Sequence, residues 1–209
     1  MKTLFLTSAL LISVLGYTQE INKTNDGYQE VVDVELSQKE IHQKINEWVA
    51  LNYKSAQDVI QLNTEDAIIL KGNFSITYRV NNNSVIYRVN NTLKFSIRDS
   101  KYKIDLVPSS LSHDTYGDMG KSIHPMFISP AVYTKSEFTL NLEMQTKETF
   151  LQMGYSEKKA QKNVDRFAGF TEAKYANYLL NKQDWDNQIT STFQSIKDFV
   201  SQSNTNDDW

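Results

Sequence analysis

The sequence predicts an α+β protein, built from an antiparallel β-sheet backed by helices and followed by a C-terminal helical extension. A helix-start motif lies at residues 37–40, apolar residues recur with period two between residues 58 and 107, and helical spacing prevails after residue 146. Each expected strand follows its neighbour through only a few turn residues, so antiparallel pairing is the natural arrangement.

The composition indicates a folded protein and excludes several classes. The chain has 209 residues, of which 40% are hydrophobic, and its formal net charge is −3. These values argue against disorder, a membrane-embedded protein and a generic nucleic-acid binder. Seven Gly and three Pro exclude a collagen-like chain. The cysteine-free sequence excludes disulfide scaffolds, thiolate zinc sites, iron–sulfur clusters, thiol nucleophiles and lipidated cysteines.

The N-terminal segment 1–18 is typical of a signal peptide. It begins with a positive charge and continues with an uncharged apolar run that is too short to span a membrane. Cleavage is expected after Gly16 or after Thr18, and an uncleaved anchor is the alternative. We therefore expect an exported, soluble, periplasmic or secreted protein that is not a lipoprotein. Residues 19–27 are predicted to be a polar leader.

A strand over residues 31–36 is expected to lead directly into a helix. Ser37 and Glu40 form a capping box, because the serine hydroxyl can accept from the Glu40 amide while the glutamate side chain returns to the Ser37 amide. The helix runs to about Tyr53. Its apolar stripe consists of Ile41, Ile45, Trp48 and Val49.

The middle of the chain predicts an antiparallel meander. The expected strands cover residues 59–62, 67–80, 85–98 and 102–107. Short turns rich in Asn, Asp and Ser separate them. Gly72 lies inside the second of these strands, which indicates a β-bulge or a point of close packing.

Residues 108–135 are predicted to form one irregular loop, because they contain all three prolines. A loop of this length inside a domain is either functional or a mobile insertion. In the next segment, residues 137–144, apolar and polar residues alternate as in a strand, but the same residues also suit the start of a helix. The periodicity leaves both alternatives open.

The C-terminal part is predicted to be a helical extension over residues 136–201. One helix would end at Gly154, a second would run from Ser156 to about Asn181, and a third would follow. The third helix would have one apolar face, formed by Trp185, Ile189, Phe193, Ile196 and Val200. Residues 202–209 are a polar tail. The sequence leaves open whether these helices pack on the sheet.

Alternation along the long strands predicts a buried face, covered by the helix that begins after Ser37, and a solvent face. The predicted core residues are Phe74, Ile76, Tyr78, Val80, Val85, Tyr87, Val89, Leu93, Phe95 and Ile97. Residues 67–107 contain seven Lys or Arg and only two acids, although the whole chain is acidic. The candidate binding residues on the solvent face are Arg79, Arg88, Lys94 and Arg98. They could receive an anionic partner, form an ordinary solvated surface, or pack on the acidic C-terminal helices.

A second candidate site lies in the 108–135 loop, where four side chains could converge on a metal ion. These side chains are His113, Asp114, Asp118 and His124. Their spacing matches no established ligand pattern, and no phosphate-binding loop, dinucleotide fingerprint or hydrolase motif is present in the sequence. We therefore expect no metal, no cofactor and no catalytic residue.

The order of these motifs resembles that of a known family. The resemblance rests on the Ser37 cap with Ile41 and Trp48, the strand around 68–72, and the hairpin Ser-Ile-Arg-Asp-Ser-Lys-Tyr-Lys at 96–103. Residues 28–107 resemble the domain-of-unknown-function 4468 family, which has a TBP-like fold and occurs in exported proteins of Gram-negative bacteria. The resemblance implies a curved antiparallel sheet backed by helices, in βαββββα order. It implies no activity. The DNA binding of the namesake fold is not expected for an acidic, exported chain.

The function that the sequence favours is a non-enzymatic binding or interaction module of the cell envelope. Its partner would be an anionic envelope component or another protein, and neither a nucleic acid nor a membrane span is expected. One alternative is a hydrolase or metal-dependent enzyme that uses the 108–135 loop. The other is a structural homo-oligomer formed through helices 156–201. The sequence leaves the oligomeric state open.

Overall fold

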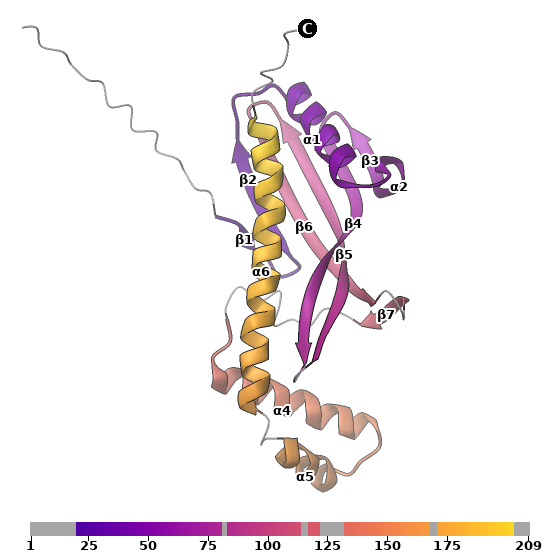
Figure 1. The fold of residues 1–209 in the computed structure, drawn as a ribbon, viewed down its shortest axis with the longest axis vertical. Helices are drawn as coiled ribbons and strands as arrows, with labels where there is room; N and C mark the ends of the chain where they lie inside the picture. The colour runs from indigo at the N-terminus through magenta and orange to yellow at the C-terminus, as the bar shows by residue number, and fades with distance from the viewer. Residues whose placement is uncertain (1–19, 81–82, 114–116, 122–131, 168–170, 203–209) are drawn as a thin grey trace, which may run out of the picture.

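The computed structural model describes residues 20–80, 83–113, 117–121, 132–167 and 171–202. The predicted signal peptide lies outside these residues. In the described part, seven strands form one antiparallel sheet in the order β1-β2-β6-β5-β4-β3, and β7 pairs with β6 (Figure 1). The strands are β1 Asn22–Lys23, β2 Tyr28–Asp33, β3 Ile60–Thr64, β4 Ala67–Val80, β5 Asn83–Arg98, β6 Lys101–His113 and β7 Gly117–Lys121.

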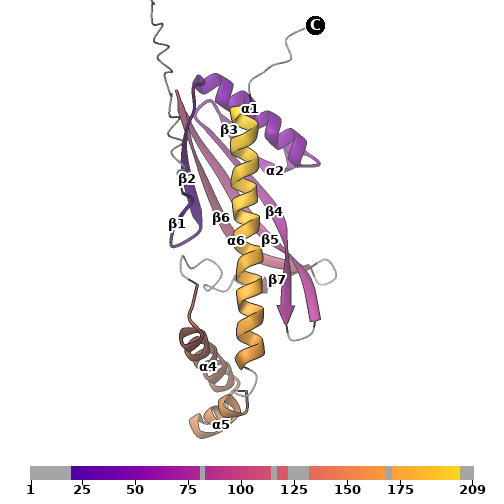
Figure 2. The same ribbon diagram turned by 60° about the vertical axis from the view of Figure 1, so that its left-hand side comes forward.

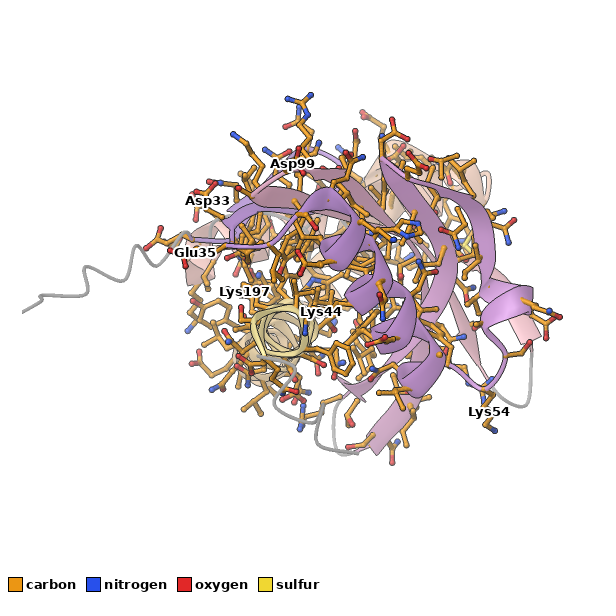
Figure 3. The ribbon with its side chains drawn as sticks, turned by 90° about the horizontal axis from the view of Figure 1, so that it is seen from above. Asp33, Glu35, Lys44, Lys54, Asp99 and Lys197 are labelled. Atoms are coloured by element: carbon orange, nitrogen blue, oxygen red, sulfur yellow. The ribbon has the colours of Figure 1, made fainter. Side chains whose placement is uncertain are left out.

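Two helices, α1 (Gln38–Asn52) and α6 (Thr171–Ser201), lie on one face of this sheet (Figures 1 and 2). We call the face that they cover the inner face and the opposite one the outer face. Seen from above, the sheet curves around both helices, with Lys44 and Lys197 on the inner side and Asp99 at the rim (Figure 3). The other helices among the described residues are α2 Ala56–Val59, α4 Lys135–Gln152 and α5 Glu157–Phe167. The predicted α+β class with a C-terminal helical extension is confirmed.

The core lies between the inner face and the apolar sides of α1 and α6. The predicted stripes of both helices are buried there, together with Ile68, Leu70, Tyr102, Ile104 and Leu106 from the strands. Of the predicted strand residues, Ile76, Val89, Leu93, Phe95 and Ile97 are buried, and Phe74, Tyr78, Val85 and Tyr87 are half-buried. The side chain of Val80 lies outside the described residues.

The start of α1 shows the predicted capping box. The Ser37 Oγ accepts from the Glu40 amide at 3.4 Å, and the Glu40 Oε2 accepts from the Ser37 amide at 2.8 Å. Asp99, in the turn between β5 and β6, adds a contact that the sequence does not indicate, because its Oδ1 accepts from the Gln38 amide at 2.9 Å. The hydrogen bonds with Ser37 hold the pKa of Glu40 below its ordinary value.

Gly72 is a point of close packing rather than a bulge. The pairing of β4 with β5 continues through Gly72 opposite Asn91 without a shift of register. The ring of Tyr53, which follows α1, lies directly over this glycine, so that a Cβ atom would come within 2.7 Å of the Tyr53 hydroxyl oxygen. A side chain at position 72 would therefore displace Tyr53.

The prediction that the sheet ends before Pro108 is wrong. Strand β6 continues through Pro108 to His113, and β7 pairs with its end. Pro108 is tolerated because β2 stops opposite Leu106 and because the β5–β6 register shifts between Asn90 and Asn91. A proline fits where the ladder is interrupted, since no amide donor is needed there. The predicted loop is thus shorter, and residues 114–116 and 122–131 of it lie outside the described residues.

Smaller differences concern the ends of other elements. The strand expected at 31–36 is β2 and lies three residues earlier, at Tyr28–Asp33. The polar leader contributes β1, which pairs with β2. A turn of helix, α2, precedes β3, because Ser55 caps it by accepting from the Asp58 amide. The hydrophobic pattern does not reveal elements this short.

The alternatives at residues 137–144 are decided by a second capping box. Thr134 and Glu137 cap each other's amides, and α4 begins at Lys135. The strand-like alternation arises because the helix buries Phe138 and half-buries Leu142, while Leu140 and Met144 are exposed. α4 ends as expected near Gly154, whose φ of 82° suits a glycine after a helix.

The expected helix boundary near Asn181 is wrong. α6 is one continuous helix of 31 residues that begins at Thr171 and passes through Asn181 without a break. α6 lies along the inner face, whereas α4 and α5 lie beyond the lower end of the sheet (Figures 1 and 2). α4 is held to α6 by the stacked rings of Phe138 and Tyr178, 5.0 Å apart. No helix among the described residues is long and apolar enough to cross a membrane.

A buried ion pair joins α6 to β2. Glu30 is 2% exposed on the inner face, and its Oε1 accepts from the Lys197 Nζ at 2.7 Å. The other carboxylate oxygen and the nearby Tyr102 hydroxyl are buried without a hydrogen-bond partner among the described residues. Burial, and next to it the charge of Glu30, raises the pKa of Tyr102. Lys197 therefore stabilises a buried carboxylate that lies close to this phenol.

Replacing Lys197 should leave the Glu30 carboxylate buried without its partner. We expect Lys197→Met to lower the free energy of unfolding by about 3 kcal/mol, because an unpaired buried charge is strongly destabilising. In a Glu30→Gln background the same replacement should have much less effect. Urea unfolding of the four proteins measures both values. Equal losses in the two backgrounds would show that the pair does not act as a unit.

The capping box should make α1 sensitive to acid. The pKa of Glu40 is lower in the folded state than in the unfolded state. The stabilisation of the fold by this carboxylate is therefore complete when the pH is above the unfolded pKa, and it is lost as the pH falls through the folded pKa. Between about pH 5 and pH 3 the wild type should lose more stability than Glu40→Gln does. Thermal unfolding across this range measures the difference, and Glu47→Gln on the same helix is the control. Parallel curves for wild type and Glu40→Gln would contradict the prediction.

Candidate functional site

The outer face contains most of the predicted binding residues. Arg88, Lys94 and Arg98 are exposed along β5 and point away from the helices, because their positions alternate with the buried residues of that strand. At about 3.3 Å per residue, Arg88 lies about 20 Å from Lys94, and Lys94 about 13 Å from Arg98. These cations therefore form a long row rather than a cluster.

Neighbouring strands extend this row sideways. Arg98 pairs with Lys101 on β6, so two like charges lie directly opposite each other. Lys94 lies between Ile69 on β4 and Asp105 on β6. The Asp105 carboxylate is bonded to Lys103 Nζ at 2.8 Å. The outer face consequently has an excess of positive charge; its cations are Lys71, Arg88, Lys94, Arg98, Lys101 and Lys103.

Arg79 does not share this open position. Its Nη1 lies 2.5 Å from the Asp184 Oδ2 of α6, and its backbone amide and carbonyl are both bonded by the side chain of Asn181. Its strand therefore meets α6 at this point. For Arg79, packing against an acidic residue of the C-terminal helix is the observed arrangement.

The acidic side chains of α6 also hold two lysines. Lys182 is 1% exposed and bonds both oxygens of Asp186, at 2.6 and 2.5 Å, while Lys23 of β1 approaches the same carboxylate at 3.2 Å. Burial lowers the pKa of Lys182, although Asp186 opposes this shift. Of these contacts, the one with Lys23 attaches α6 to β1, whereas the bonds with Lys182 lie within α6.

The metal candidates are only partly within the described residues. His113 ends β6, and Asp118 lies in β7, paired with Ser112. Asp114 and His124 lie outside the described residues. Among the residues that the structure describes, no group of three or more His, Asp or Glu could hold a metal ion. The hydrolase or metal-dependent alternative stays a prediction.

A hollow on the other side of the sheet was not predicted from the sequence. It has a volume of about 240 Å³ and lies where α1 and α6 meet the inner side of β4, β5 and β6. Its walls include Trp48, Asn91 and Gln188. One signal was present in the sequence, since Asn91 is a polar residue at a core position of the β5 alternation.

One segment of the chain matches a known family. Residues 28–108 match the DUF4468 family, described as a domain of unknown function with TBP-like fold. The predicted resemblance is confirmed, and the matched segment nearly coincides with the residues from which it was inferred. The DUF4468 segment contains α1 and the strands from β2 to the first half of β6, but not α6.

Two solved structures are similar to this chain. A DUF4468 family protein from Bacteroides ovatus is 10% identical, with a TM-score of 0.43 over 78% of this chain and 90% of that one. A TBP-like protein from Parabacteroides distasonis is 15% identical, with a TM-score of 0.35 over 75% of this chain and 92% of that one. Among curated proteins, no relative matches the chain.

Lysine labelling can distinguish the open outer face from the buried lysine of α6. With a small acylating reagent, we expect Lys94 to react as fast as the exposed Lys39 of α1, whereas the buried Lys182 should react last. The reason is access, because the reagent must reach the amine from solvent. Peptide mass spectrometry over time measures each rate. Protection of Lys94 to the level of Lys182 would mean that the outer face is covered in solution.

Proposed function

We propose that this chain is an exported, non-enzymatic binding module of the cell envelope, and that its outer face binds an extended anionic partner. The single observation that carries the proposal is the asymmetry of the sheet. Helices α1 and α6 cover the inner face, whereas the outer face presents Arg88, Lys94 and Arg98 as exposed cations. Export is proposed from the predicted signal peptide in the first 18 residues.

The spacing of the cations favours a particular kind of partner. Neighbouring members of the row lie about 13 to 20 Å apart along β5, so a small anion bound at one position, such as the Arg98–Lys101 pair, would leave the rest of the row unused. An extended anionic polymer or an acidic protein surface can contact all three at once, and weak contacts made together give useful affinity. The surrounding chain is acidic overall, so the positive field is confined to this face.

The test compares two triple variants of equal charge. The outer-face variant replaces three cations of the row by Ser, namely Arg88, Lys94 and Arg98. The control variant replaces three lysines that are exposed elsewhere by Ser, namely Lys39, Lys54 and Lys158. Binding of fluorescent poly-L-glutamate to the mature protein is measured by polarisation, with acidic and neutral phospholipid vesicles as further probes. Circular dichroism first confirms that both variants fold.

We expect the outer-face variant to bind the polyanion about tenfold more weakly than wild type, because three exposed charge contacts are lost. The control variant should lose much less. Raising the salt from about 0.05 to about 0.5 M should weaken wild-type binding, since exposed charges are screened. Equal losses in both variants would show that net charge alone matters and would refute the proposed surface.

A further inference from the structure

The hollow on the inner side of the sheet has the features of a built pocket for a small ligand. It lies on the opposite side of the sheet from the outer face, so a ligand here would be independent of the proposed polyanion binding. Its volume of about 240 Å³ leaves room for one small ring.

Several hydrogen-bonding groups at this pocket have no protein partner among the described residues. Asn91 is 6% exposed, and its amide donates only to the Val89 carbonyl, at 3.3 Å, so its carbonyl oxygen is left without a donor. The side chains of Gln188 and Ser191 on α6 also make no hydrogen bond there. The Asn91 oxygen is not among the fully buried atoms that lack a partner, so it is open to the pocket, where water or a ligand can donate to it.

Aromatic rings form the other wall and are held in place. The Trp48 Nε1 donates to the Ser195 Oγ at 3.1 Å, and its ring meets that of Tyr53 edge-on at 6.1 Å. Tyr53 is in turn seated over Gly72, where no side chain interferes. The Tyr53 hydroxyl can donate, because a phenol is protonated at neutral pH, and burial raises its pKa further. Phe74 lies beside them at the pocket.

No charged side chain lines the pocket among the described residues. A charged ligand would therefore lose its hydration without gaining a counter-charge, which disfavours it. Amide and hydroxyl groups opposite aromatic rings instead suit a molecule with polar edges and an apolar face. We propose that this pocket binds the single ring of a neutral sugar, with Asn91 and Gln188 bonding its hydroxyls and Trp48 or Tyr53 contacting its C–H face.

The probe is D-glucose or N-acetyl-D-glucosamine, titrated into the full mature chain, with D-glucuronate as a charged ring of matched size. Nitrogen-15 NMR follows the indole signal of Trp48 and the side-chain amides of Asn91 and Gln188. A ligand of about a dozen heavy atoms binds weakly, so a Kd of about 1 mM is expected for a neutral sugar. The signals of Trp48, Asn91 and Gln188 should shift together and saturate.

Two variants remove the polar wall, and two controls leave it intact. Gln188→Ala removes one amide, and Asn91→Leu replaces a buried amide by an apolar side chain of similar size that suits its neighbours. Gln183→Ala removes an exposed amide from the same helix outside the pocket, and Lys94→Ser changes the outer face. Each pocket variant should weaken sugar binding about fivefold or more. Neither control should change it.

The proposal is overturned if neither neutral sugar shifts the Trp48 and Gln188 signals in a saturable manner at concentrations of up to about 100 mM. It is also overturned if glucuronate binds as tightly as the neutral sugars, since the site would then not select against charge. Weakening by Gln183→Ala equal to that by Gln188→Ala would show that the response does not come from this pocket, and this too would overturn it.

Discussion

The contact on which the rest of the structure depends is that between the apolar side of α6 and the inner face of the sheet. β4 and β5 form a hairpin of 14 and 16 residues, and β5 alone extends about 50 Å. α1, with 15 residues, covers only about 22 Å, whereas the 31 residues of α6 cover about 46 Å. Only a helix of that length keeps most of the hairpin's apolar face away from water.

The placement of α6 along the sheet is defined by its apolar packing and, in addition, by polar contacts near its middle and near its C-terminal end. Near its C-terminal end Lys197 bonds Glu30, in its middle Asp186 holds Lys182 and Lys23, and below these Asp184 bonds Arg79. A shift of α6 by one helical turn would break its contacts with Glu30, Lys23 and Arg79. The carboxylate of Glu30 is almost fully buried, so the loss of its partner would be costly.

The same arrangement creates both candidate surfaces. Since α1 and α6 lie on one side of the sheet, the outer face keeps its cations exposed along β5. On the inner side, side chains leave a pocket of about 240 Å³ where α1 and α6 meet the sheet. Asn91 and Gln188 lie at this pocket. The pocket is thus a product of helix placement, with polar residues at the positions where it opens.

The matched DUF4468 segment ends at residue 108, yet α6 lies more than sixty residues later. Even so, Trp185 and Phe193 belong to the same buried cluster as Tyr28 and Phe95. The hydrogen bond from the Trp185 indole to the Tyr28 hydroxyl, at 2.5 Å, joins the two parts inside the core. α6 therefore completes the core of the sheet, while α4 and α5, the other helices of the extension, lie apart from the sheet at the N-terminal end of α6.

The sequence by itself determined those helices and strands that form because of residues close to them in the chain. The capping box at Ser37 and Glu40, the strand over residues 67–80 and the apolar stripe of Trp185 to Val200 all depend on neighbours a few residues away, and each was predicted. The tertiary structure alone decided the rest. Strand β6 passes Pro108 because distant strands end or shift beside it, Arg79 turns to Asp184 because α6 lies there, and the pocket joins residues from Trp48 to Ser195. These outcomes depend on contacts between segments that are far apart in the chain, and no local pattern records which segments will meet.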